Sequence, residues 1–237
     1  MKNKMSNQEN TVSAIGQMVN SENVYHLGNP MAKKRLLIIG NSITLHGVRA
    51  DISWYGNWGM AATKPENDYV HKLYEYLQRD GIDVYIRVRQ AVQEWECCYP
   101  KENVLDAFMA DRDFQADILL FRLGENIQAE YIGKPIDETE LFVKMKELVE
   151  YVVPNGKALY STCFWSTVWS DFCIRKLAEE RQEPVVELGP LSLDPSMKAL
   201  EDFEHWGVAN HPGDKGMQAI ADLLYSELKN LLKSVSI

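Results

Sequence analysis

The sequence lacks several features that would place it in common functional classes. No run approaches the roughly 18 apolar residues of a membrane-spanning helix, so we expect no membrane span. Basic residues are in the minority, since 25 Lys and Arg stand against 34 Asp and Glu and leave a net charge of -9. Such a chain has no basic stripe for binding phosphates, so a nucleic-acid partner is not expected.

Cysteine is also scarce. The four cysteines are Cys97, Cys98, Cys163 and Cys173, and the adjacent pair does not suit a disulfide framework. No Cys-x-x-Cys or Cys/His spacing typical of a metal site appears, so we expect neither a metal nor a cofactor. A reducing compartment is the simpler interpretation. No apolar signal-peptide segment follows the first lysines, which predicts a cytoplasmic protein, although a truncated sequence would hide an export signal.

The pattern along the chain predicts a short extension followed by one domain. Residues 1–31 are polar and without strong periodicity, and we interpret them as an N-terminal extension that is at most partly ordered. The domain, 32–237, is long enough to bury a substantial core. Apolar runs predict strands at 35–40, 82–90, 116–124, 157–162 and 184–188. Helical spacing predicts helices at 68–81, 103–112, 137–153, 171–182 and 214–233.

Alternating strands and helices indicate parallel β-α-β units with helices on both faces of a sheet. The expected strands are apolar almost throughout, as in sheets covered on both sides. We therefore predict an α/β fold, a three-layer sandwich around a central, mainly parallel five-stranded sheet. In open sheets of this type, ligands bind at the carboxyl ends of the strands.

One stretch changes abruptly from apolar to polar at such an end. The strand expected at 35–40 runs directly into Asn41 and Ser42. One interpretation is that Asn41 or Ser42 caps a helix that follows. The other is that Ser42 is a nucleophile held at the edge of the sheet where ligands bind.

Two further polar stretches are expected near the same edge. The strand at 116–124 ends in Gly124-Glu125-Asn126, at the carboxyl end of a neighbouring strand. His211 lies shortly before the last helix, where Pro212 and the glycine after it keep the backbone from becoming helical early. A serine, an amide and a histidine are thus expected on one side of the sheet.

These stretches, "IIGNSIT", "LGEN" and "NHPGDKGM", resemble three signature blocks of the SGNH, or GDSL-type, hydrolases over about residues 34–234. Ser42 matches the family's nucleophile, Asn126 the amide that binds the oxyanion, and His211 the general base. The resemblance implies a flavodoxin-like sheet and ester hydrolysis without a metal. Because Thr44 stands where Gly-x-Ser-x-Gly would have its second glycine, an α/β-hydrolase elbow is not indicated. A phosphate-binding Gly-Lys-Ser/Thr is also missing, which argues against a P-loop.

The first departure from the family concerns the second block, which usually supplies a glycine whose N–H helps bind the oxyanion. This chain reads "VRQAVQEWE" there, without a glycine. Because a backbone N–H survives a change of side chain, Gln90 or Ala91 could donate instead. We expect an oxyanion hole made by Ser42, Asn126 and Ala91.

The second departure is that Val208 occupies the position of the family's aspartate, three residues before the histidine. That aspartate holds the imidazole in one tautomer and stabilises the imidazolium. Either a backbone carbonyl near Val208 or a displaced carboxylate takes over the orienting role, the candidate carboxylates being Asp202, Glu204, Glu125 and Glu94. If the loop geometry resembles that of the family, Val208→Asp would restore the acid and raise turnover.

The substrate is indicated less directly. Aromatic residues follow the expected strand ends, namely Trp54, Tyr55, Trp58, Trp165 and Trp169. Such residues pack in the core or in loops, stack on sugar rings or line an acyl pocket. Candidates for the substrate pocket are Asn41, Trp58 and Glu125. Arg122 is interpreted as an ion-paired structural residue.

The function predicted from these residues is a serine-dependent ester hydrolase acting on a small ester, such as an acylated sugar. A catalytically weak or inactive domain that binds a carbohydrate or a protein is the alternative. Val208 and the missing glycine favour this alternative, whereas the joint presence of Ser42, Asn126 and His211 favours the enzyme. The sequence does not indicate an oligomeric state.

Overall fold

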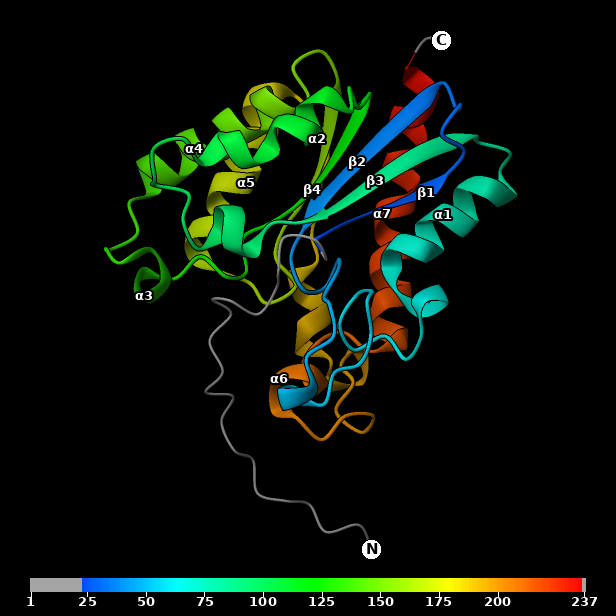
Figure 1. Ribbon diagram of the computed structural model, residues 1–237, viewed down its shortest axis with the longest axis vertical. Helices are drawn as coiled ribbons and strands as arrows, with labels where there is room; N and C mark the ends of the chain where they lie inside the picture. Colours follow the sequence, from blue (N-terminus) through cyan, green and yellow to red (C-terminus); the bar gives the residue numbers. More distant parts are fainter. Residues whose placement is uncertain (1–22, 236–237) are drawn as a thin grey trace, which may run out of the picture.

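The computed structural model describes residues 23–235. They form a three-layer sandwich, with a six-stranded sheet in the middle and helices on both sides (Figure 1). The strand order is β1-β3-β2-β4-β5-β6. The strands are β1 (Val24–Gly28), β2 (Lys34–Gly40), β3 (Val84–Gln90), β4 (Ile118–Arg122), β5 (Lys157–Ser161) and β6 (Val185–Val186). The predicted α/β sandwich is therefore confirmed.

Five of the strands are parallel, as predicted, and the sixth is added at one edge. Strand β1 pairs antiparallel with β3, from Val24 opposite Arg89 to Gly28 opposite Tyr85. It comes from the segment predicted as an N-terminal extension, so part of that segment belongs to the sheet. Residues 1–22 lie outside the described part of the chain, and a domain boundary at residue 32 stays a prediction.

Helices cover both faces of the sheet. On one face lie α1 (Tyr69–Arg79) and α7 (Asp214–Ser234), and on the other lie α2 (Met109–Asp113), α4 (Glu138–Val152) and α5 (Val168–Arg181) (Figure 1). Shorter segments are η2 (Ala50–Ile52), η3 (Pro65–Asn67), η4 (Val92–Glu96), η5 (Val104–Phe108), α3 (Ala129–Ile132), η6 (Gly189–Leu193), η7 (Pro195–Met197) and α6 (Trp206–Ala209). None of the helices in residues 23–235 is both long and apolar enough to cross a membrane.

The central strands explain why the sequence reads as apolar runs. In β2, Leu36 and Ile38 pack under α1 and α7, while Leu37 and Ile39 pack under α4 and α5. All four side chains are buried. Successive side chains of a strand point to opposite faces, so a sheet covered on both sides needs apolar residues at every position.

The register of the sheet brings three loops together at its carboxyl edge. Gly40 at the end of β2 is opposite Gln90 of β3 on one side and Arg122 of β4 on the other. The loops after these three residues therefore begin side by side. The short helix α6 lies at the same end of the molecule (Figure 1).

Candidate active site

Ser42 lies in a tight turn directly after β2. The Asn41 carbonyl accepts the N–H groups of Thr44 (2.9 Å) and Leu45 (3.0 Å), and no helix follows until Ala50. The interpretation of Asn41 or Ser42 as a helix cap is therefore wrong. At Gly40, a Cβ atom would lie 1.9 Å from the Thr44 Oγ1, so the turn requires glycine there.

His211 is held between α6 and α7 with its ring directed at Ser42. The Ser42 Oγ and the His211 Nε2 are 2.8 Å apart, although the residues are 169 positions apart in the sequence. The His211 N–H donates to the Val208 carbonyl (3.0 Å), and the His211 carbonyl accepts the Ala199 N–H (3.0 Å). Both backbone groups of the histidine are thus bonded, which fixes the loop.

A backbone carbonyl orients the imidazole. The His211 Nδ1 lies 2.6 Å from the Gly207 carbonyl oxygen, which can only accept a hydrogen bond. The proton must then sit on Nδ1, and Nε2 presents its lone pair to Ser42. Of the two alternatives left open by the sequence, the carbonyl is the one observed.

The candidate carboxylates are occupied elsewhere or exposed. Glu125 pairs with Arg122, Glu94 accepts a hydrogen bond from Asn23, and Asp202 and Glu204 are exposed. Val208 itself is fully buried in an apolar cluster with Ile52, Trp54, Met60, Ala61 and Ala199. No carboxylate among the described residues hydrogen-bonds to His211.

His211 is neutral at ordinary pH. Burial lowers its pKa to about 3; the Gly207 carbonyl opposes this shift, while nearby His46 and His205 add to it. The ring of Trp165 stands edge-on to the imidazole, with the ring centroids 4.9 Å apart. A neutral imidazole with a free Nε2 lone pair is the form that can accept a proton from Ser42.

Asn126 lies on the loop after β4 and is bonded to Glu96, for which no role is predicted from the sequence. Its Nδ2 donates to the Glu96 Oε2 at 2.7 Å, and the Gly124 N–H donates to the Glu96 Oε1 at 2.5 Å. Glu96 ends the π-helical segment η4, in the stretch where the resemblance to the family led us to expect a glycine. Glu96 stands in a stretch with two glutamates, and only the fold shows which one turns inward.

The assignment of Ala91 to the oxyanion hole has to be corrected. The Ala91 N–H donates to the Gly40 carbonyl at 2.8 Å, which continues the pairing of β2 and β3 by one residue. The Gln90 N–H is likewise bonded, to the Asn23 carbonyl. By contrast, the Ser42 N–H makes no hydrogen bond within residues 23–235.

Two of the three substrate-pocket candidates also have to be corrected, because their side chains are bonded within the protein. Asn41 is fully buried and donates to the Glu125 Oε2 at 2.5 Å. The Glu125 side chain is 3% exposed and also accepts from Arg122 and from the Phe164 N–H. Trp58 is partly exposed and donates its Nε1–H to the Ala62 carbonyl, and its place in a pocket stays a prediction.

Arg122 has the structural role predicted for it. Its side chain is 1% exposed, and its Nη1 donates to the Glu125 Oε1 at 2.9 Å. This ion pair joins the last residue of β4 to the loop that carries Asn126. It fixes Glu125, while Asn41 binds the same carboxylate from the loop of β2.

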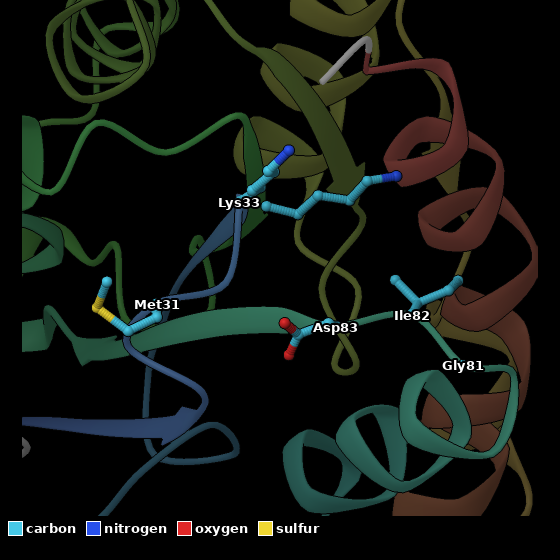
Figure 2. Close-up of a pocket in the computed structure, with 6 residues that line it drawn as sticks. Met31, Lys33, Gly81, Ile82 and Asp83 are labelled. Carbon is cyan, nitrogen blue, oxygen red and sulfur yellow. The ribbon is translucent and has the colours of Figure 1, made fainter.

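A cavity of about 480 Å³ lies at the amino ends of strands β2 and β3, on the other side of the sheet from the carboxyl edge (Figure 2). It is lined by Met31, Lys33, Lys34, Gly81, Ile82 and Asp83, around the start of β2. Since Ser42 follows the other end of this seven-residue strand, the cavity is roughly 20 Å from the serine. It is therefore separate from the candidate active site. No cluster of His, Cys, Asp and Glu suited to a metal is found in the described part of the chain.

A second buried histidine gives the fold a measurable pH dependence. His46 is 1% exposed, and burial lowers its pKa to about 4, with Arg49 adding to the effect and the Gly47 carbonyl opposing it. Between about pH 6.5 and pH 4, His46 is protonated in the unfolded chain but stays neutral in the folded protein. This residue therefore reduces stability as the pH falls from about 6.5 to 4.

We expect His46→Asn to reduce this acid sensitivity. At pH 5 the wild type should lose about 2 kcal/mol more of its pH 7 stability than the variant does, because each unit of pKa difference corresponds to about 1.36 kcal/mol. Urea unfolding of both proteins at pH 7 and pH 5 measures the difference. Other titrating groups, including Glu96 with its raised pKa, are common to both proteins and cancel. An equal loss of stability in the two proteins between pH 7 and pH 5 would contradict the assignment of this acid sensitivity to His46.

The sequence matches no family model and no curated protein, but solved structures share its fold. A lipase/acylhydrolase from Enterococcus faecalis is 11% identical, with a TM-score of 0.57 over 86% of this chain and 100% of that one. A family 3 carbohydrate esterase from Talaromyces cellulolyticus is 17% identical, with a TM-score of 0.55 and coverages of 86% and 100%. The esterase EstA from Pseudoalteromonas sp. is 14% identical, with a TM-score of 0.53 and coverages of 85% and 100%. Other neighbours are described as GDSL-like lipases. The chain therefore has the flavodoxin-like fold of the SGNH hydrolases.

Proposed function

We propose that this protein is a serine-dependent ester hydrolase that removes a small acyl group from a carbohydrate or another small ester. The observation that carries the proposal is the 2.8 Å contact between the Ser42 Oγ and the His211 Nε2 at the carboxyl edge of the sheet. A serine, a neutral histidine and an acceptor behind the histidine are the parts that nucleophilic catalysis requires. The esterases that share the fold support the same reaction class.

In the first step, the Ser42 Oγ attacks the ester carbonyl carbon while the His211 Nε2 takes the hydroxyl proton. The carbonyl π electrons move to oxygen and give a tetrahedral oxyanion. When this collapses, the bond to the leaving alcohol breaks and His211 returns the proton to that alcohol. Water, deprotonated by the same histidine, then attacks the acyl-enzyme; the bond to the Ser42 Oγ breaks, His211 returns the proton to that oxygen, and the acid is released.

The Gly207 carbonyl serves this mechanism in part. It fixes the tautomer and the plane of the His211 ring. It carries no charge, however, so it stabilises the imidazolium less than a carboxylate would. With a pKa of about 3, His211 is also a weak base. The oxyanion that forms beside it must supply the counter-charge, and we expect slower turnover than in a complete triad.

The oxyanion would be held by the Ser42 N–H and by the Asn126 amide. The Ser42 N–H has no partner within residues 23–235. The Asn126 Nδ2 donates one N–H to Glu96, and its other N–H can donate to the oxyanion. Donors of this kind act in a site with little water, where they stabilise developing charge strongly.

Asn126→Ala should lower kcat by about 100- to 1,000-fold, the loss seen when one oxyanion donor is removed. The decrease is expected because the variant keeps Ser42 and His211 but binds the tetrahedral oxygen less strongly. Initial rates on a chromogenic acetate ester measure it. Asn29→Ala, an exposed asparagine bonded to Asp83 at the opposite edge of the sheet, is the matched control. A kcat for Asn126→Ala within about threefold of the wild type would remove Asn126 from the mechanism.

The proposal itself is tested with a series of 4-nitrophenyl esters of increasing acyl length and with acetylated oligosaccharides. We expect the highest kcat/KM for the acetyl ester and release of acetate from the sugar. Activity that rises with acyl length would point to a lipase-like substrate. If no ester is hydrolysed, the esterase proposal is wrong, and a binding domain with an inactive site becomes the favoured function.

A further inference from the structure

Glu96 is a buried carboxylate that the proposed mechanism does not use. Glu96 is fully buried and is the last residue of the π-helix η4, in the loop after β3. Its two oxygens bind two points of a different loop, the Gly124 N–H at 2.5 Å and the Asn126 Nδ2 at 2.7 Å. π-helical turns are rare and often occur at functional sites. The element that lacks the expected glycine thus contributes a carboxylate directed at the candidate oxyanion donor.

We propose that Glu96 is a positioning residue that orients the Asn126 amide for the oxyanion. The inference rests on the proposed function. The terminal torsion of asparagine is broad, so a free amide would turn between presenting its N–H groups and its carbonyl oxygen to the substrate. By accepting one N–H, the carboxylate excludes the flipped orientation and leaves the second N–H of the same nitrogen for the tetrahedral oxygen.

Apart from the Gly124 N–H, which donates to Glu96, the loop is held by contacts that do not involve Glu96. Gly124 has a φ of +141°, and a Cβ atom there would lie 2.8 Å from both the Cys163 Sγ and the Ser170 Cβ. The Ser170 Oγ donates to the Gly124 carbonyl at 2.8 Å. Glu125 is fixed by Arg122. Loss of the Glu96 carboxylate should therefore free the Asn126 amide without unfolding the loop.

The Glu96 carboxyl is fully buried, and burial disfavours its charged form, so a catalytic role can be separated from a stabilising one. Burial, and after it the negative charge of Glu125, raise the pKa of Glu96 to about 7, against the hydrogen bonds from Gly124, Asn126 and Asn41. At pH 8 the folded protein must hold this group ionised in a buried place. A neutral glutamine should therefore leave the stability unchanged or higher, while it loses one of the two hydrogen bonds because its amide nitrogen cannot accept.

The test is a double-mutant cycle of Glu96→Gln and Asn126→Ala, assayed on a chromogenic acetate ester at pH 8. We expect Glu96→Gln to lower kcat by about tenfold or more with KM within about twofold, since only transition-state binding is lost. Once Asn126 is alanine, Glu96→Gln should have no further effect, because the carboxylate acts through the amide. The urea midpoint of Glu96→Gln should equal or exceed that of the wild type.

Glu94→Gln is the matched control, because Glu94 lies on the same π-helix with its side chain on Asn23. It should keep the wild-type kcat. Multiplicative losses in the double variant, or a Glu96→Gln kcat within twofold of the wild type, would overturn the inference while leaving a Ser42-dependent esterase intact. A wild type without esterase activity would overturn the proposed function and the role of Glu96 together.

Discussion

Replacing Ser42 with alanine should abolish ester hydrolysis, with a loss in kcat of about four orders of magnitude or more, while the protein stays folded. The Ser42 Oγ bonds to the His211 Nε2 and is the atom that would carry the acyl group. The backbone contact of the residue, from the Met60 N–H to the Ser42 carbonyl, is unaffected by the substitution. Initial rates and thermal unfolding of both proteins measure the two expectations.

A second serine and a covalent probe make this test sharper. Ser192→Ala removes a hydroxyl bonded to the Gly189 carbonyl on η6, and it should keep wild-type activity. An electrophilic phosphonate should add its mass to the peptide that contains Ser42 in the wild type and in Ser192→Ala, but not in Ser42→Ala. Equal hydrolysis by the wild type and Ser42→Ala would show that the measured activity comes from elsewhere.

The sequence was sufficient to place Ser42 and His211 because their positions follow from the ends of elements. Ser42 comes two residues after a strand whose last five residues are apolar and buried, and His211 comes just before an amphipathic helix. In a parallel sheet such ends share one edge, so residues 169 positions apart could be expected together. The 2.8 Å contact depends on the turn at Gly40 and on the loop at Gly207, and no sequence pattern specifies either distance.

The errors came from the direction of groups within loops. Ala91 extends the pairing of β2 and β3 by one residue, which uses its N–H. The side chains of Asn41 and Glu125 turn inward and bind each other, although they stand next to Ser42 and Asn126 in the sequence. Two adjacent polar residues at a strand end look alike in a sequence, and only packing decides which one faces the solvent.

The edge strand β1 was missed for a related reason. Val24–Gly28 is short and reads as a mixture of polar and apolar residues, because its side chains are only partly buried. It is fixed by antiparallel backbone hydrogen bonds to β3, which leave no periodic signal of their own. Glu96 was overlooked because a π-helix has no sequence pattern that separates it from a loop.

Val208→Asp is expected to destabilise the protein strongly and not to raise turnover, contrary to what the resemblance to the family suggests. The Val208 side chain is fully buried among apolar residues, whereas the imidazole is bonded through the Gly207 carbonyl one residue earlier. An aspartate at 208 would place a carboxylate in this cluster without a cation beside it. Such a change costs about 3–5 kcal/mol, through burial of an unpaired charge or through the raised pKa that avoids it.

Val208→Ala separates the packing of this position from its chemistry. It should cost about 2 kcal/mol, because it leaves a cavity, yet keep kcat near the wild-type value, since the Gly207 carbonyl belongs to the backbone. Alanine at Asp202 or Glu204 should likewise leave kcat unchanged. Urea unfolding and ester hydrolysis measured on all four variants distinguish a carbonyl partner of the imidazole from a carboxylate partner. A folded Val208→Asp that hydrolyses esters faster than the wild type would mean that the loop can turn this side chain toward His211, and that a carboxylate outperforms the carbonyl as the partner of the imidazole.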